Sequence, residues 1–317
     1  MSVADCARCQ SPLEREDLRC AVCALPVPAA AAPVVAETTA QILRCHGCGA
    51  AVRYRADIQA PRCDFCDSVM EIETPEDPIE QAEHFVRFAV TDDQARRALK
   101  RWLGSFGFFR PSDLQSAAAV DALKPLWWVG WMFEAEGSMT WAADSNAGSR
   151  RSDWAPHSGA APLSLRNVVV PASRGLTEAE CRGLVRRYDI SNAAPEPHGH
   201  AGATVEQFAV QRSAARRIIT KALEASAREK AVPLIPGARY RKLSVSVLPT
   251  RLSSSHYAFP AYVLAYRYQD KLYRAIVHGQ DPSCVLGEAP FSWAKIAAVV
   301  VAVVAVIGIV STVVSMS

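Results

Sequence analysis

The sequence lacks the short motifs that carry most enzyme chemistry. It has no GxxxxGK[ST] phosphate loop, no GxGxxG fingerprint, no GxSxG nucleophile elbow and no HExxH metal helix. Cys181 and Cys284, the two cysteines outside CxxC pairs, have no nearby base that would make either of them a nucleophile. We therefore expect that the protein is not an enzyme.

Charge of either sign is missing from the last 22 residues, which follow Lys295. Residues 296–314 read IAAVVVAVVAVIGIVSTVV, and as a helix they span roughly 28 Å, close to the ~30 Å hydrocarbon core of a bilayer. A buried core helix is the alternative, but a core helix of this length usually keeps one polar face. The pattern predicts one C-terminal transmembrane helix at 296–314, which makes the protein tail-anchored.

An apolar secretory leader is also absent from residues 1–20, which contain several charges and a CxxC pair. Lys271, Arg274 and Lys295 precede the apolar segment and no charge follows it, which places the preceding body in the cytosol. Cysteines gathered in CxxC pairs are typical of metal ligation in a reducing compartment. We expect a single-pass protein of the bacterial cytoplasmic (inner) membrane.

Eight of the ten cysteines form four CxxC pairs. A CxxC turn presents two thiolates to one side of a zinc ion, and two such turns complete a tetrahedral shell. An iron–sulfur cluster accepts the same ligands, but evenly paired turns favour zinc. The predicted ligands of two structural Zn²⁺ ions are Cys6, Cys9, Cys20 and Cys23 in the first site, and Cys45, Cys48, Cys63 and Cys66 in the second.

These sites predict zinc ribbon 1 at residues 1–25 and zinc ribbon 2 at 41–73, joined by an Ala/Pro linker at 26–40. In ribbon 2, Gly47 and Gly49 suit the positive φ of a metal-binding turn, whereas ribbon 1 lacks such glycines. Each ribbon has one more acidic than basic residue, and a zinc ion with four thiolates adds about −2. Phosphate binding needs a positive surface, so protein contact is favoured over nucleic acid.

The body at 78–292 has signals of both helices and strands, which predicts an α+β fold. Capping-box patterns begin at Thr91, Thr177 and Thr204, each followed by helical apolar periodicity. Strand candidates are 125–133, 138–142, 164–170, 243–249, 260–268 and 271–278.

Two of these strands look like copies of each other. Aromatic residues stand at the same even offsets from Pro125 and from Pro260, so that the rings share one face of each strand. This predicts an internal duplication, with halves at 78–170 and 171–292. The rings form either a core against helices or a stacking platform for nucleobases, and the core is the commoner arrangement.

The chain resembles a bacterial family with N-terminal zinc ribbons, an α+β middle and a C-terminal anchor, often labelled primosomal protein N′-like or replication-restart helicase-like. The most specific likeness runs from a Pro-aromatic strand to a lysine before the anchor, and its residues here are Pro260, Tyr262, 277–280, 287–290, Ser292 and Lys295. The chain departs from the family pattern at His278, Asp281 and Pro282. Without a phosphate loop no helicase motor is expected.

Members of this family resemble membrane-side adapters that accompany phage-shock and SPFH-type envelope-stress proteins. The resemblance implies a non-enzymatic adapter or scaffold that recruits cytosolic or peripheral proteins to the membrane. The alternative is a membrane-tethered nucleic-acid-binding protein in replication or stress, which a shared basic and aromatic groove around Trp127, Trp131 and 239–242 would favour. A body that binds a small ligand is a third hypothesis.

Overall fold

The computed structural model describes residues 4–14, 17–27, 42–53, 62–73, 80–147, 153–269 and 271–316. The predicted class is confirmed in its coarse form, because the chain combines helices, sheets and two N-terminal clusters of four cysteines. The strands are β1 (Ala4–Asp5), β2 (Pro12–Leu13), β3 (Ile42–Cys45), β4 (Ala51–Arg53), β5 (Met70–Glu73), β6 (His84–Phe85), β7 (Ala119–Ser145), β8 (Ala155–Pro171), β9 (Thr204–Val205), β10 (Tyr240–Tyr268), β11 (Lys271–His278) and β12 (Val285–Gly287). The α-helices are α1 (Asp92–Gly104), α2 (Leu114–Ala117), α3 (Glu178–Val185), α4 (Arg212–Ala231) and α5 (Trp293–Met316).

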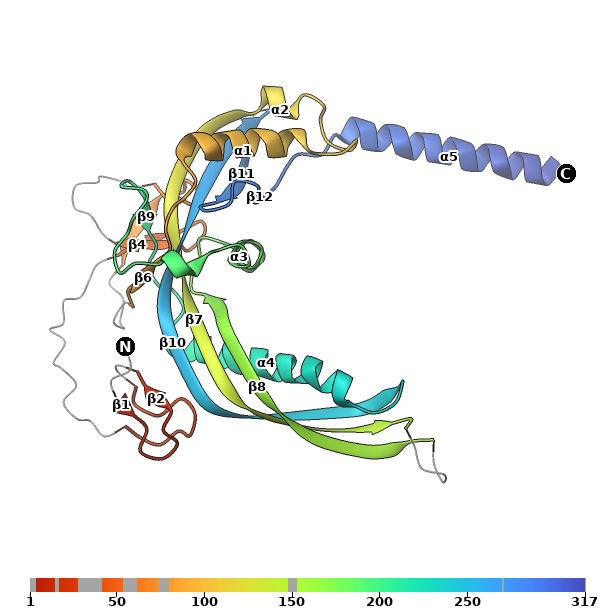
Figure 1. The fold of residues 1–317 in the computed structure, drawn as a ribbon. Helices are drawn as coiled ribbons and strands as arrows, with labels where there is room; N and C mark the ends of the chain where they lie inside the picture. Colours follow the sequence, from red (N-terminus) through yellow and green to blue (C-terminus); the bar gives the residue numbers. More distant parts are fainter. Residues whose placement is uncertain are drawn as a thin grey trace.

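The body is built on one sheet with the strand order β12-β11-β10-β7-β8. Strands β7 and β10 run antiparallel over nearly their whole lengths, and with β8 they extend beyond the rest of the sheet as a curved arm (Figure 1). The short strands β6 and β9 add in parallel to β10 and β7 respectively. The predicted strand at 138–142 is part of β7, because that strand continues without a turn from residue 119 to residue 145.

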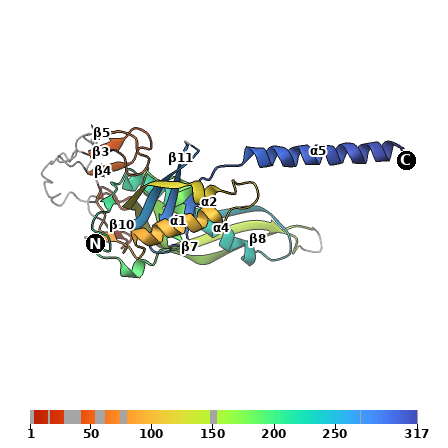
Figure 2. The ribbon, with the colours of Figure 1, turned by 90° about the horizontal axis from the view of Figure 1, so that it is seen from above.

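The sheet has a different cover on each face (Figure 2). On one face, α1 and α4 pack over a cluster that includes Trp127, Trp131 and Tyr262. On the other face, α3 and ribbon 2 pack over a second cluster that includes Trp128 and Phe259. Adjacent residues of a strand point to opposite faces, so the neighbours Trp127 and Trp128 serve different cores.

The two halves of the body repeat the same hydrogen bonds around an approximate two-fold axis. The Trp131 indole donates to the Val210 carbonyl at 2.8 Å, and the Tyr262 hydroxyl donates to the Val90 carbonyl at 2.6 Å. Two further pairs of backbone bonds are equivalent. The bond from Ala172 N–H to Val129 O corresponds to the bond from Gly279 N–H to Pro260 O. The bond from Glu206 N–H to Trp127 O corresponds to the bond from Val86 N–H to Ala258 O. Each half therefore has the order strand, helix, strand, strand: β6-α1-β7-β8 and β9-α4-β10-β11.

These bonds correct the register in which the sequence matches the two strands. Matching Pro125 to Pro260 makes Trp131 equivalent to Tyr266, whereas the hydrogen bonds make it equivalent to Tyr262. An even shift along a strand keeps every side chain on the same face, so the aromatic pattern could not choose between registers. The axis passes instead near the paired residues Trp128 and Phe259, whose rings stack at 4.6 Å.

The helix starts predicted at Thr91 and Thr177 are confirmed, because both residues form complete capping boxes. The start predicted at Thr204 is wrong. Thr204 lies in β9, and α4 begins at Arg212 after Gln211, which makes no side-chain cap. Parallel pairing of Thr204 with Leu126 of β7 replaced the local capping interaction that the sequence pattern suggested.

Helix α5 extends away from the body (Figures 1 and 2), and its side chains are described as far as Ile307. Val300, Val301, Val304 and Ile307 are exposed. Among the residues that the structure describes, no helix is long and apolar enough to cross a membrane. The side chains of 308–314, part of the predicted span, lie outside the described residues.

Two candidate metal centres and their attachment to the sheet

In ribbon 1 the four predicted ligands come together. The Sγ atoms of Cys6 and Cys23 are 3.6 Å apart and those of Cys9 and Cys20 are 3.5 Å apart, and all four lie within 4.8 Å of one another. The hairpin of β1 and β2 carries the first CxxC turn, and residues 20–23 form the second. Sulfurs at these separations surround a single tetrahedral position.

Ribbon 2 assembles its four cysteines in the same way on the sheet β4-β3-β5. The sulfur distances are 3.3 Å for Cys45 and Cys66 and 3.6 Å for Cys48 and Cys63. Backbone N–H groups of Gly47 and Phe65 also point at the sulfurs of Cys45 and Cys63, at 3.3 and 3.4 Å. Such N–H bonds orient thiolate ligands and stabilise their charge.

All four CxxC turns have one backbone geometry. The residue after the second cysteine has a positive φ in each: 57° at Gln10, 58° at Ala24, 77° at Gly49 and 64° at Asp67. Its N–H donates to the carbonyl of the first cysteine at 2.9 to 3.0 Å. The expected positive φ is thus found at Gly49 but not at Gly47, where a Cβ would meet Ser68. Ribbon 1 makes the same turns without glycine.

The donor sets fit zinc. Four thiolates at tetrahedral separation are the ligands of structural zinc sites, and they leave no coordination position open for a substrate. The pKa of Cys63 is lowered to about 5, because the Cys48 thiol and then the backbone N–H groups of Phe65 and Cys66 donate to its thiolate, against the effect of burial. The pKa of Cys6 is lowered to about 6, chiefly by the backbone N–H of Cys9. Each site therefore has one thiol that readily loses its proton to a metal.

Ribbon 2 forms part of the core of the body. The Phe65 ring, which follows Cys63 in the turn, is buried against Gly175, where no side chain competes for the space. Lys124 of β7 donates to the Cys63 carbonyl at 3.3 Å and lies 3.4 Å from the Asp64 carboxylate. The four-cysteine site of ribbon 2 is therefore attached directly to β7.

A buried carboxyl group lies where ribbon 2 meets β9. Glu206 is 1% exposed, and its Oε1 accepts hydrogen bonds from the N–H groups of Arg174 and Gly175, both at 3.1 Å. Burial raises the pKa of Glu206 to about 7, and the hydrogen bonds offset only part of this effect. Its other oxygen has no partner among the described residues.

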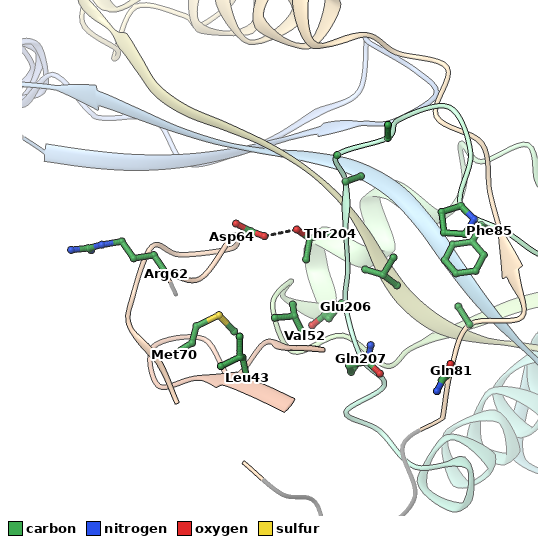
Figure 3. Close-up of a pocket in the computed structure, with 16 residues that line it drawn as sticks. Leu43, Val52, Arg62, Asp64, Met70, Gln81, Phe85, Thr204, Glu206 and Gln207 are labelled. Atoms are coloured by element: carbon green, nitrogen blue, oxygen red, sulfur yellow. Dashed lines mark hydrogen bonds between the residues drawn. The ribbon is translucent and has the colours of Figure 1, made fainter. Parts of the chain in front are cut away.

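Glu206 also lines a cavity of about 640 Å³ between ribbon 2 and the body. Figure 3 shows Leu43 and Met70 of ribbon 2 on one side and Phe85 and Gln81 of the body on the other. A hydrogen bond of 2.6 Å from Thr204 to Asp64 crosses between the two parts. The lining combines apolar side chains with three ionisable ones, Arg62, Asp64 and Glu206.

Ribbon 1 is held to α4 and β10 by a largely buried set of charges. Arg216 donates to Asp17 at 2.7 Å and to Glu14 at 3.1 Å, and the side chain of Asp17 is only 4% exposed. Arg212 lies between these acids and Glu80, to which it donates at 3.1 Å. We call this set of Glu14, Asp17, Glu80, Arg212 and Arg216 the charged seat. Glu14 also accepts from the backbone of Ser254, so ribbon 1 covers the open edge of β10 there.

The charged seat was not predicted from the sequence. Glu14 and Asp17 lie between the two CxxC turns of ribbon 1, where they contribute to its acidic balance, and their partners lie about 200 residues later. One sequence signal could have shown that α1 and α4 are equivalent. Two short stretches of the chain occur twice: Phe88-Ala-Val90 recurs as Phe208-Ala-Val210, and Ala95-Arg-Arg97 recurs as Ala215-Arg-Arg217. His46, which lies between Cys45 and Cys48 of ribbon 2, is exposed and its Nε2 lies 2.7 Å from the Glu71 carboxylate.

The aromatic rows are core. Trp127, Trp131 and Tyr262 are at most 1% exposed, so they present no ring face to a nucleobase. Residues 239–242 lie at the far end of the arm, where Tyr240 pairs with Ser145, well away from Trp127 on the same sheet. Comparison of the chain with known protein families, curated proteins and solved structures gives no match. The suspected family resemblance stays a prediction.

Proposed function

We propose that the protein is a membrane-anchored, zinc-stabilised adapter that holds partner proteins at the bilayer surface. The observation that carries this proposal is the combination of two closed four-cysteine sites, both fixed to one sheet, with helix α5 on the same body, whose valines from Val300 to Val306 are exposed. Closed sites stabilise a fold and leave no metal position for catalysis. The recruited proteins would be cytosolic or peripheral, and envelope-stress proteins of the phage-shock or SPFH type are the class that the family resemblance suggests.

The membrane part of the proposal rests on α5. The helix has 24 residues, about 36 Å at the usual rise, and its sequence has no charge after Lys295. Five of its described valines, between Val300 and Val306, are exposed, so a bilayer would bury side chains that are otherwise in contact with water. The order of charges before the helix favours a cytosolic body in the inner membrane.

The partner-binding part rests on what the ribbons leave exposed after they attach to the body. Leu18 of ribbon 1 is 86% exposed, and Val69 and Ile72 of ribbon 2 are also exposed. Apolar side chains at such positions are typical of protein contact sites when they recur on one module. The nucleic-acid alternative loses its specific support, because Trp127 and Trp131 are buried.

The test is to purify the tagged full-length protein from detergent-solubilised membranes, with and without nuclease, and to compare variants. Leu18→Glu and Ile72→Glu should lose the same discrete partners while keeping two zinc equivalents. Leu248→Glu is the matched control, because Leu248 lies on the arm rather than on a ribbon and its exposure of 67% falls between those of Leu18 and Ile72. Partners that disappear with nuclease, or that all three variants retain, would contradict the adapter proposal.

The anchor is tested separately by carbonate washing of membranes. Val301→Asp with Val304→Asp places two acids near the middle of the span, each costing about 3 kcal/mol of insertion. This variant should be released from the membrane, whereas Val301→Ala with Val304→Ala should stay. Retention of the acidic variant would show that α5 does not span the bilayer.

A further inference from the structure

A group of exposed aromatic side chains lies at the base of α5. Phe108 and Phe109 come from the loop after α1, and Phe291 and Trp293 come from the segment that enters α5. Phe108 is 63% exposed and Trp293 is 75% exposed, although aromatic rings of this size are normally buried. Four such residues from two distant segments make a patch and not a scatter of single residues. We call these four residues the aromatic collar.

The two segments of the collar are joined by specific bonds. The Ser292 N–H donates to the Phe109 carbonyl at 2.9 Å, and the Lys295 ammonium donates to the Arg110 carbonyl at 2.9 Å. In return, the Arg110 guanidinium donates to the Ala289 carbonyl. The loop is therefore held beside the first turn of α5 and keeps its aromatic rings there.

Two cations sit among the rings. Arg110 lies over the Phe291 ring at 3.7 Å, and Lys295 lies over the Phe108 ring at 5.4 Å. Both side chains line a cavity of about 250 Å³ whose walls contain no acidic residue. In the described part of the chain, neither cation forms an ion pair with a carboxylate. The Asp113 carboxylate accepts a hydrogen bond of 2.9 Å from the Tyr268 hydroxyl, and the backbone carbonyl of Glu288 accepts one from Tyr266.

We propose that the aromatic collar, with Arg110 and Lys295, is a second membrane contact that inserts into the headgroup region of an anionic phospholipid bilayer. The inference rests on the anchor proposed above, because the collar lies beside the first turn of α5, where the apolar segment begins. Trp side chains concentrate at the membrane–water interface, and Phe side chains enter the boundary between headgroups and acyl chains in segments that lie on a membrane. Nearby Arg and Lys side chains meet the lipid phosphates.

The experiment uses the full chain reconstituted in vesicles of phosphatidylcholine and phosphatidylglycerol. A photo-reactive benzoylphenylalanine replaces Phe108 in one variant, Val304 within α5 in a second, and Leu18 of ribbon 1 in a third. We expect lipid adducts by mass spectrometry from positions 108 and 304 and none from position 18.

The positions separate the two proposals. Adducts from position 304 without adducts from 108 would overturn the collar and leave the anchor intact. Adducts from 108 without 304 would support the collar and overturn the spanning helix. No adduct from either position would overturn both, and equal adducts from 18 and 108 would show that the collar has no special place at the bilayer.

The role of Arg110 and Lys295 is tested by measuring which lipid is found in the adducts. With the photo-reactive residue at position 108, Arg110→Gln with Lys295→Gln should reduce the preference for phosphatidylglycerol by about fivefold for each cation removed. Arg110→Lys is the control, because it keeps the charge and should keep the preference. An unchanged preference in the double variant would overturn the role of the cations.

Discussion

Replacement of Ala24 by Gly is expected to tighten metal binding by ribbon 1. Ala24 has a φ of 58°, and its side chain is exposed, so the change removes no packing. A left-handed conformation costs an ordinary residue about 1–2 kcal/mol, whereas glycine adds about 0.5–1 kcal/mol of unfolded-state entropy. The net gain is about 0.5–1 kcal/mol of folding free energy. Because ribbon folding and metal binding are coupled, zinc affinity should rise about two- to fivefold.

The matched control is Ala7→Gly in the other turn of the same site. Ala7 is also exposed, but its φ is not positive, so only the entropic cost remains and zinc affinity should fall about two- to fivefold. Chelator competition on the full chain measures both, since ribbon 2 is unchanged in the two variants. Weaker binding by both variants would refute the reasoning that Ala24 carries backbone strain.

Three other variants test the remaining parts. Cys45→Ser with Cys63→Ser should release about one zinc equivalent by metal analysis, and an unchanged content would exclude the ribbon 2 site. Burial raises the pKa of Glu206 from 4.5 to about 7, so the free energy of unfolding should fall as pH rises from about 4.5 to 7. Glu206→Gln should remove this pH dependence. At pH 8 it should stabilise the protein by up to about 3 kcal/mol, measured by thermal unfolding. Arg216→Met removes the cation closest to Glu14 and Asp17 and leaves only their longer contacts with Arg212. It should weaken ribbon 1 attachment by up to about 3 kcal/mol, measured by hydrogen exchange, whereas the exposed Arg217→Met should not.

The metal centres could be predicted because their information is local. A CxxC turn fixes the positions of both sulfurs within four residues, so the spacing alone groups Cys45 with Cys48 and Cys63 with Cys66. The same locality explains why the capping box at Thr91 was recognised correctly. Structures whose interacting residues lie within a few positions of each other can therefore be predicted from the sequence.

The rest of the site depends on pairings between distant residues. Nothing local to Asp17 indicates Arg216, and nothing local to Phe65 indicates Gly175. At Thr204 the local pattern was misleading. The pattern fits a helix cap, but in the structure the backbone of Thr204 pairs with β7. The sequence could therefore name the eight cysteines that gather in two clusters, but not the surfaces on which the ribbons rest.

The approximate two-fold axis explains how one sheet can attach two different modules. Ala95 of α1 and Ala215 of α4 are equivalent and fully buried, so the two helices present matching Arg-Arg pairs at the next positions. On α4, Arg216 of that pair is bound by ribbon 1. On α1, Arg96 is exposed, and the helix ends instead in the loop that carries the aromatic collar beside α5. Equivalent helices thus attach to different modules. Because both helices pack on one continuous core, we infer that the sheet keeps ribbon 1 at a fixed separation from the collar.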